Sequence, residues 1–317
     1  MSDRNQPTSD TARLTRLGIT VFERGWLSSN NVLFQGTGST ALVDSGYCTH
    51  AAQTVDLVRE VLQKRPLDLL LNTHLHSDHC GGNSALQSAF PELKTLIPPG
   101  QAGAVADWNP VALTHEPTGQ QCPQFRFDGT LSPGDTVQLG DFCWEIHAAK
   151  GHDPHSVVLF EPASRVLISA DALWENGFGV VFPELEGIDA FDEVADTLSL
   201  IEMLNPVAVI PGHGQVFEDV AEALHRARTR LDQFTRSPDK HRRYALKVLL
   251  KFKLLEWQSV SFSELLAWYA KTSYISSIEQ RSESQDVDAL RVSLQSLIAD
   301  LAKSNALRVE GDTIIDT

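Results

Sequence analysis

The first two thirds of the chain alternates short apolar runs with segments of helical periodicity. Residues 17–47 show β-branched and apolar runs broken by Gly, Ser and Asn, the pattern of paired strands. Residues 51–65 carry apolar positions at helical spacing, and residues 67–76 form an apolar run too brief for a helix with its own caps. Residues 128–173 read as several strands separated by Pro-Gly, Leu-Gly and Glu-Pro turns. Residues 188–214 predict a helix stopped near Asn205 and Pro206, then a strand and a Gly-rich loop. The pattern predicts a mixed sheet with helices outside it.

From about Val216 the sequence pattern changes, and helical segments replace the short apolar runs. An arginine-rich helical segment breaks at Ser237 and Pro238, and amphipathic helices are predicted over residues 242–257, 261–272 and 287–304. A closing hairpin around residues 310–312 completes a pattern typical of a winged-helix module. We therefore predict a disordered tail over residues 1–12, a main domain over residues 13–236 and a winged-helix-like domain over residues 237–317.

Composition narrows the classes of function. A chain of 317 residues can bury one large and one small core, and its formal charge of -15 argues against broad non-specific binding to nucleic acid or anionic membranes. The polar N-terminus has no apolar segment of the kind found in signal peptides or membrane anchors. The four cysteines of the chain include no C-x-x-C pair, a pattern typical of proteins whose thiols are reduced and unpaired. The expected location is the cytoplasm.

One short stretch, NTHLHSDHCGGN at residues 72–83, concentrates polar side chains directly after an apolar run. In an extended backbone, His74 and His76 leave the chain on the same side, while Asp78 and His79 follow in a turn. Imidazole and carboxylate are good zinc ligands, and a cation would offset the cost of gathering these groups at a buried sheet edge. The two glycines, residues 81 and 82, permit close packing of the backbone. The alternatives are a run of surface histidines or a satisfied pair in the core.

Three further candidates each follow a predicted strand: His152, Asp171 and His213. Loops at the carboxyl ends of strands converge in layered α/β structures, so these side chains are expected to meet the histidine motif there. Singly, each has another interpretation: Asp171 as a helix N-cap, His213 as a turn residue, and His155 in place of His152 as the ligand.

With these motifs, the chain from about Leu17 to Phe217 resembles the metallo-β-lactamase superfamily, including a LVDSGY segment like its early Asp-x-Gly strand end. The resemblance implies the α+β class: an αββα four-layer sandwich with a dinuclear metal site at one edge of the sheets. It implies that one metal would be held by His74, His76 and His152, and a second by Asp78, His79 and His213. Asp171 would bridge the two metals, and Asp44 would orient the histidine loop.

Such a site predicts hydrolysis. Two divalent ions can share a hydroxide formed at neutral pH, which is the predicted nucleophile, with Asp78 as both ligand and orienting group. Zinc fits the ligand set best, although iron or manganese also suit imidazole and carboxylate. Position 171 is Asp, where several β-lactamases of this fold have cysteine, and the sequence around His152 also departs from the common pattern of the family. The aspartate weakens the prediction of an antibiotic hydrolase, and the resemblance, to glyoxalase II and its relatives within the superfamily, implies a small ester or thioester as the substrate.

Two long irregular segments, residues 104–125 and 174–187, are expected near the mouth of the site. Trp174, Phe178 and Phe182 are predicted to form an apolar wall, with His115 as a polar contact. The alternative is that these aromatic side chains simply pack the loop onto the sheet.

Residues 225–253 carry ten Lys and Arg against two Asp and Glu. This excess could bind an anionic small-molecule substrate or single-stranded RNA, which leaves an endoribonuclease as the alternative enzyme; the simpler interpretation is a solvated helix face. The terminal module is neutral overall, with ten basic and ten acidic residues from residue 241 onward, so DNA binding is not expected. The sequence leaves open a homodimer, and also a non-catalytic metal-binding scaffold or regulator.

Overall fold

The computed structural model describes residues 9–280 and 287–317. Residues 1–8 of the predicted tail lie outside the described residues. Residues 9–12 belong to helix α1 (Ser9–Arg16), so the expectation of disorder is wrong for these four. The reason lies just downstream, where Leu14 and Leu17 are buried in the core between the sheets and anchor the helix.

The first sheet has the strand order β1-β2-β3-β4-β5-β6. Antiparallel pairing joins β1 to β2 and β2 to β3, with Ile19 opposite Phe34 and Val32 opposite Val43, which confirms the paired strands predicted over residues 17–47. The remaining strands pair in parallel, and helix α2 (Ala51–Leu62) connects β3 to β4. The strands are β1 (Ile19–Phe22), β2 (Asn31–Gln35), β3 (Thr40–Val43), β4 (Leu69–Leu71), β5 (Lys94–Ile97) and β6 (Gly129–Thr130).

The second sheet has the strand order β11-β10-β9-β8-β7. Its strands pair antiparallel except for β10 and β11, which are parallel and are joined through helix α7 (Phe191–Leu204). The strands are β7 (Thr136–Leu139), β8 (Phe142–Ala148), β9 (Val157–Glu161), β10 (Val166–Ala170) and β11 (Ala208–Pro211). The predicted turn at Pro133-Gly134 precedes β7, and those at Leu139-Gly140 and Glu161-Pro162 begin at the last residues of β7 and β9.

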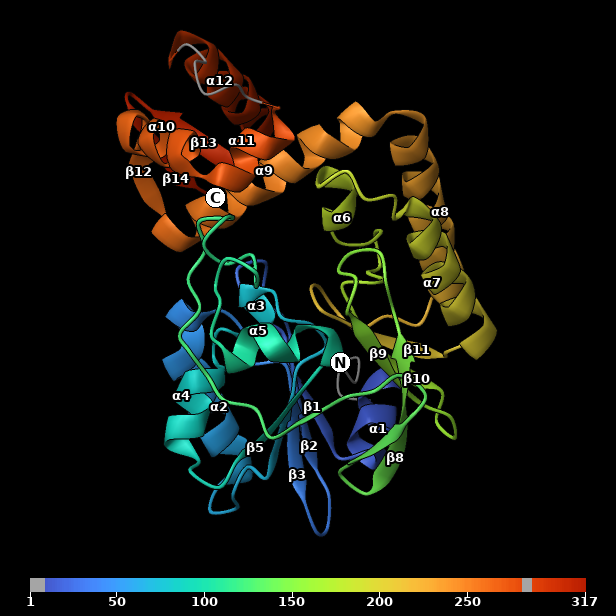
Figure 1. Cartoon of the computed structure of the whole chain (residues 1–317). Coiled ribbons are helices and arrows are strands. Elements are labelled where there is room, and N and C mark those ends of the chain that lie inside the picture. Colours follow the sequence, from blue (N-terminus) through green and yellow to red (C-terminus); the bar gives the residue numbers. More distant parts are fainter. Residues whose placement is uncertain (1–8, 281–286) are drawn as a thin grey trace, which may run out of the picture.

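Strand alternation explains the layers. Along β10, Val166 and Ile168 face the core between the two sheets, whereas Leu167 faces the helices α7 and α8 (Val220–Arg236). In the first sheet, Phe34 faces the same central core, whereas Leu33 faces α2 and α4 (Asn83–Ala89). Helices therefore cover the outer face of each sheet, as Figure 1 shows. This confirms the predicted mixed fold with helices outside the sheets.

Helix boundaries follow the local sequence signals. Helix α7 ends at Leu204 because Asn205 adopts a left-handed conformation, with φ of 50°, immediately before Pro206. Asp219 caps α8 by accepting a hydrogen bond from the backbone of Glu222. The remaining short helices of this part of the chain are η1 (Cys48–His50), α3 (Ser77–Cys80), η2 (Pro99–Gln101), α5 (Ala102–Ala106) and α6 (Phe182–Leu185).

The C-terminal region is mainly helical. The chain bends at Ser237, and α9 (Pro238–Trp257) begins with the predicted proline in its first turn. The predicted helices and hairpin are present as α10 (Phe262–Lys271), α12 (Val287–Lys303), β13 (Leu307–Glu310) and β14 (Thr313–Asp316). Two elements were missed: α11 (Ser273–Ile278) and β12 (Ser259–Ser261), which pairs with β14. Both are too short for their periodicity to show in the sequence. The winged-helix identity of this module stays a prediction.

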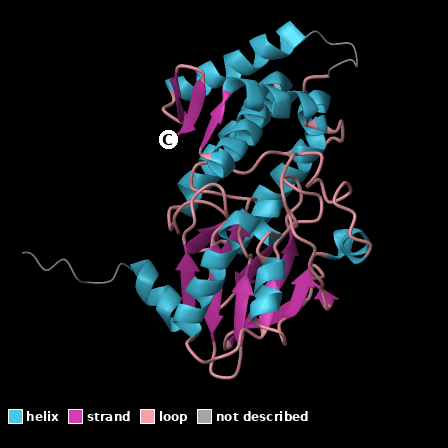
Figure 2. Cartoon of the chain, turned by 90° about the vertical axis from the view of Figure 1, so that its left-hand side faces the viewer, coloured by secondary structure: helices cyan, strands magenta, loops and turns pink. Residues whose placement is uncertain are grey.

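Helix α9 joins the C-terminal region to the main domain, and Figure 2 shows this region above the sheets. Ala245, Leu249 and Leu250 of α9 lie in the hydrophobic core of the C-terminal region. The same core includes Val180 and Leu185 from the main domain. In addition, Phe252 packs against Tyr47 with ring centroids 5.0 Å apart. The two parts thus share a continuous apolar contact. No helix in the described segments is long and apolar enough to cross a membrane.

His241 on α9 is buried and makes the stability of this contact sensitive to acid. Its Nε2 accepts a hydrogen bond from the backbone of Val181 at 3.1 Å, and burial, helped by Arg242, lowers its pKa from 6.5 to about 4. The neutral imidazole is therefore favoured in the folded protein. Its contribution is complete above pH 6.5 and is lost as the pH falls from 6.5 to 4.

We expect the free energy of unfolding to fall by on the order of 2–3 kcal/mol more in the wild type than in His241→Gln between pH 7.5 and 4.5. Glutamine can still accept the Val181 hydrogen bond but does not titrate. Urea unfolding of both proteins at the two pH values measures the difference. Equal losses in the two proteins would contradict this role of His241.

Candidate functional site

The histidine motif lies in a tight loop after β4. His74 and His76 precede α3, and the single turn of α3 carries Asp78 and His79. Close packing holds the loop against the segment after β3: a Cβ added at Gly81 would lie 2.6 Å from the backbone nitrogen of Cys48, and one at Gly82 would collide with the backbone oxygen of Ser45. Real Cβ atoms essentially never come so close to backbone. The sequence expectation that these glycines permit close approach is confirmed.

Three of the histidines form one group. His74, His76 and His152 offer ring nitrogens that lie within 4.8 Å of one another. His76 Nδ1 and His152 Nε2 are 2.9 Å apart, and the ring of His74 lies 5.0 Å from that of His152. His152 comes from the loop after β8, so the group joins one sheet to the other. The alternative ligand His155 is not part of this group.

A second group combines two carboxylates with two imidazoles. Asp78, His79, Asp171 and His213 also offer ligand atoms within 4.8 Å of one another. His213 Nε2 is 3.1 Å from Asp78 Oδ2, and His79 Nε2 is 3.4 Å from Asp171 Oδ1. His213 comes from the loop after β11. Asp171 and His213 follow the carboxyl ends of β10 and β11, and Asp78 and His79 lie on the short helix α3, which follows β4. The sequence predicts this placement after strands.

Asp171 lies between the two groups. Its Oδ1 faces His79 at 3.4 Å and His213 at 3.9 Å, whereas its Oδ2 faces His152 at 3.4 Å. The preceding residue, Ala170, has a φ of 46°, a conformation that is rare for a residue with a Cβ, and the strand register shifts there. This strained bend turns the Asp171 carboxylate toward both groups.

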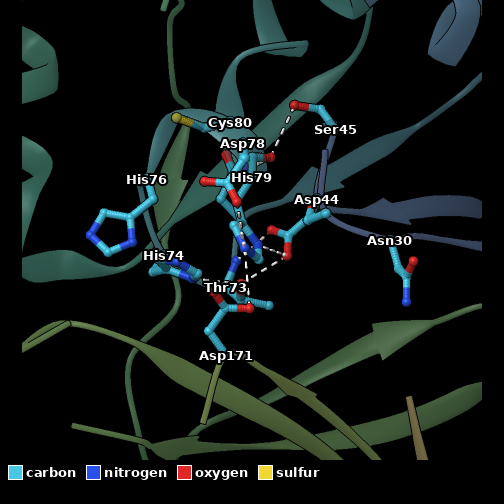
Figure 3. Close-up of polar contacts among 12 residues, drawn as sticks. Asn30, Asp44, Ser45, Thr73, His74, His76, Asp78, His79, Cys80 and Asp171 are labelled. Atoms are coloured by element: carbon cyan, nitrogen blue, oxygen red, sulfur yellow. Dashed lines mark hydrogen bonds and ion pairs between the residues drawn. The ribbon is translucent and has the colours of Figure 1, made fainter. Parts of the chain in front are cut away.

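Hydrogen bonds behind the rings fix their orientation. Asp44, itself with a φ of 59°, accepts hydrogen bonds from the backbone and hydroxyl of Thr73 and from Nδ1 of His79 at 2.8 Å (Figure 3). His152 Nδ1 donates to the carbonyl of Val180 at 2.6 Å, and His213 Nδ1 donates to that of Gly25 at 3.1 Å. These bonds point the Nε2 atoms of His79, His152 and His213 toward the centre of the site, the orientation that a metal ligand requires.

The donor set fits a pair of metal ions. His74 Nε2 and His79 Nε2 are buried and have no hydrogen-bond partner within the described part of the chain, an arrangement that is costly without a ligand. Burial together with the nearby imidazoles of His79 and His76 holds the pKa of His74 well below its usual value, so its lone pair is available. Burial raises the pKa of Asp171, but the imidazoles, His79 first, outweigh it and hold this pKa well below its usual range. Imidazole nitrogens and carboxylate oxygens are ligands for zinc, iron and manganese.

A pocket opens directly onto these groups. Of the four residues predicted to contact substrate, Trp174 and Phe182 line it. The structure places the other two elsewhere: Phe178 is 1% exposed and packs on Phe234, and His115 is 2% exposed with its Nε2 bonded to the carbonyl of Leu75. Their burial leaves neither side chain facing the pocket, and for Phe178 this agrees with the alternative interpretation that the aromatic side chains serve packing.

Other pocket residues were missed by sequence reasoning. Trp26 stacks on His213 with ring centroids 5.3 Å apart, although it is 55% exposed, and Tyr244, Val248 and Phe252 approach from α9. Trp26 lies in a loop without any motif. In the sequence, the α9 residues indicate only the apolar face of an amphipathic helix. That pattern does not specify which part of the protein the apolar face contacts.

Gly212, just before His213, provides a sharp test of how tightly the second group is packed. A Cβ at this position would collide with Asp171 Oδ1 and would lie 3.0 Å from both His79 Cε1 and the carbonyl carbon of Ala170. We expect Gly212→Ala to displace the carboxylate and to reduce bound metal and activity by at least about 10-fold, the lower range for a disturbed outer partner of a metal ligand. Metal analysis and kinetics measure this loss.

Gly103→Ala is the matched control, because a Cβ there meets nothing within 4 Å. It lies in α5 and should leave metal content unchanged while slightly stabilising the helix. Unchanged metal binding in Gly212→Ala would show that the site tolerates the added methyl group.

Sequence comparisons agree with this geometry. A sequence model of the metallo-beta-lactamase superfamily matches residues 24–213. Hydroxyacylglutathione hydrolases are similar over about half of each chain: that of Nostoc sp. is 28% identical over 52% of this chain and 55% of its own, and that of Rhodobacter capsulatus is 31% identical over 49% and 52%. The human acyl-coenzyme A thioesterase MBLAC2 is 26% identical over 62% of this chain and 72% of its own.

Solved structures show the same fold. A metallo-beta-lactamase family protein from Thermus thermophilus is 17% identical with a TM-score of 0.55, covering 95% of this chain and 99% of that one. A beta-lactamase domain protein from Burkholderia ambifaria is 18% identical with a TM-score of 0.52, covering 95% and 91%. Because the matched family region contains both groups of histidines and aspartates, the chain belongs to the metallo-beta-lactamase superfamily.

Proposed function

We propose that this protein is a dinuclear zinc-dependent hydrolase of acyl thioesters. The observation that carries the proposal is the position of Asp171, whose two oxygens face different groups of histidines in a pocket with apolar walls. His74, His76 and His152 would hold one ion, Asp78, His79 and His213 the other, and Asp171 both. When bound, two such ions lower the pKa of water to about 7 and polarise the scissile carbonyl.

The chain's own residues position these components. Burial raises the pKa of Asp78, but His79 and His213 outweigh it and keep this carboxyl ionised, so an oxygen of Asp78 can orient the attacking water. Asp44 holds His79 from behind, and the indole of Trp26 covers one face of His213. These contacts keep the imidazoles from rotating and limit access of bulk water to the reacting atoms.

Apolar side chains near the metal groups favour an acyl substrate. Trp174 and Phe182 line the pocket, and so do Leu249 and Phe252 of α9. A neighbouring groove of about 320 Å³ shares four lining residues with the pocket: Trp26, Tyr244, Val248 and Phe252. If the carbonyl of a thioester lies at the two groups of histidines and aspartates, its acyl chain would extend along this groove. The relatives named as hydroxyacylglutathione hydrolases and an acyl-coenzyme A thioesterase support the same bond type.

The basic segment over residues 225–253 gives no comparable support for RNA. Its arginines form ion pairs on the protein surface, among them Arg228 with Glu202 at 2.7 Å and Arg243 with Asp300 at 2.7 Å. These pairs neutralise much of the local charge excess. We therefore keep the thioester proposal and treat RNA cleavage as an outcome of its test.

The test uses full-length protein purified without added metal, with bound metals counted by mass spectrometry. Hydrolysis of lactoylglutathione and of acyl-coenzyme A esters of increasing chain length is followed before and after chelation, with single-stranded RNA alongside. We expect two zinc ions per chain and chelator-sensitive thioester turnover that zinc restores. The absence of such turnover would overturn the proposal, and RNA cleavage would replace it. Reloading with iron or manganese in turn determines which metal supports activity.

A further inference from the structure

A third group of metal-ligand side chains lies behind the histidine loop and takes no part in the proposed hydrolysis. Cys80, His115 and Cys122 offer ligand atoms within 4.8 Å of one another. Cys80 ends α3, directly after His79, and its side chain points away from Asp171 (Figure 3). His115 and Cys122 come from the long loop after α5. The group therefore joins that loop to the histidine loop.

His115 is held with one nitrogen free for a ligand. Its Nε2 donates a hydrogen bond to the carbonyl of Leu75 at 3.0 Å, which assigns the proton to Nε2 and leaves the Nδ1 lone pair toward the cysteines. The residue is 2% exposed, and its Nδ1 has no hydrogen-bond partner in the described segments. A buried acceptor without a donor is costly, so the site is prepared for a group that shares this lone pair.

The two sulfur atoms have the separation expected of ligands to one ion. Cys80 Sγ and Cys122 Sγ are 3.7 Å apart. Two thiolates bound to tetrahedral zinc at about 2.3 Å would lie about 3.8 Å apart. A disulfide needs a separation of about 2.05 Å, so forming one would require the two loops to move.

We propose that Cys80, His115 and Cys122 bind a zinc ion, separate from the histidine and aspartate groups. Two thiolates and an imidazole are a preferred zinc set, and three protein ligands leave a fourth position for water on the side where Cys122 is partly exposed. Binding releases the thiol protons to solvent. Ser77 of α3 already donates to Gln120 of the same loop at 2.5 Å, and Thr114, Thr118 and Gln120 line the pocket. The ion would therefore fix the position of this loop, which lines part of the pocket, relative to the histidine loop.

Cobalt titration of the full chain tests this site, because cobalt bound to thiolate shows a ligand-to-metal charge-transfer absorption that nitrogen and oxygen ligands do not produce. The protein is stripped of metal and kept reduced. We expect the band in the wild type and in the Cys48→Ser/Cys143→Ser double variant, which retains only the two proposed cysteines. We expect its loss in Cys122→Ser, where the side chain is partly exposed and the substitution should not disturb folding. Metal analysis should give one ion fewer in Cys122→Ser than in the wild type.

Two outcomes would overturn the proposal. One is no thiolate band in reduced wild-type protein, or a band that depends on Cys48 or Cys143. The other is a mass lower by two hydrogens with Cys80 and Cys122 resistant to alkylation as purified, which would make them a disulfide pair. The band should persist in Asp171→Asn, where the hydrolytic site is damaged. A failure of thioester hydrolysis would thus leave this proposal standing.

Discussion

Replacing Asp171 by asparagine is expected to lower kcat/KM for thioester hydrolysis by more than about 100-fold, beyond the loss typical of one outer partner of a metal ligand. Asparagine keeps the shape of the side chain but removes the charge and replaces one oxygen with an NH₂ group. Because the two oxygens face His79 and His152 respectively, whichever orientation the amide takes, one group of histidines meets a donor instead of an acceptor. Kinetics and metal content, measured on the same preparation, should fall together.

Asp196→Asn is the matched control, since Asp196 lies on an exposed position of α7 outside both groups. It should keep the metal content and activity of the wild type. Retention of two ions and full turnover by Asp171→Asn would contradict the bridging role. Loss of turnover with both ions still bound would assign Asp171 to a step after metal binding.

Replacing Lys253 by methionine is expected to destabilise the protein by about 3–5 kcal/mol, the cost of leaving one member of a buried ion pair uncompensated. Lys253 Nζ lies 2.6 Å from both Glu256 Oε2 and the carbonyl of Gly119, and both charged side chains are buried. Glu256 also accepts hydrogen bonds from Tyr47 at 3.2 Å and from Gln121 at 2.7 Å. The pair therefore ties α9 to the main domain, and without Lys253 the Glu256 carboxylate stays buried and unpaired. Urea unfolding measures the loss.

The double variant Lys253→Met/Glu256→Gln separates the unpaired charge from the lost packing. It removes the buried charge and should recover most of the stability, whereas Lys240→Met, at an exposed position of the same helix, should change it by less than about 0.5 kcal/mol. A double variant as unstable as Lys253→Met would contradict the electrostatic explanation. A loss below about 1 kcal/mol in the single variant would show that water reaches Glu256.

Much of the main domain could be predicted from sequence because local patterns and tertiary contacts agree there. Alternation in β2 and β10 already separates residues that face the other sheet from residues that face helices. The end of α7 is signalled by Asn205 before Pro206, a boundary that needs no tertiary partner. In the C-terminal region, by contrast, β12 has three residues and acquires its identity only by pairing with β14.

The sequence by itself determined the family and the segments that carry its histidines and aspartates, because ligand spacing within one loop and placement after apolar strands are local properties. Only the tertiary structure decided how Asp171 shares its oxygens, why Asp44 holds His79, and that Trp26 and α9 complete the pocket. The tertiary structure also decided that Phe182 lines the pocket whereas Phe178 is buried in the core. It placed Cys80 beside Cys122, which is 42 residues away in the sequence. Such contacts depend on which faces of distant elements meet, and a side chain's chemistry alone does not specify its partner.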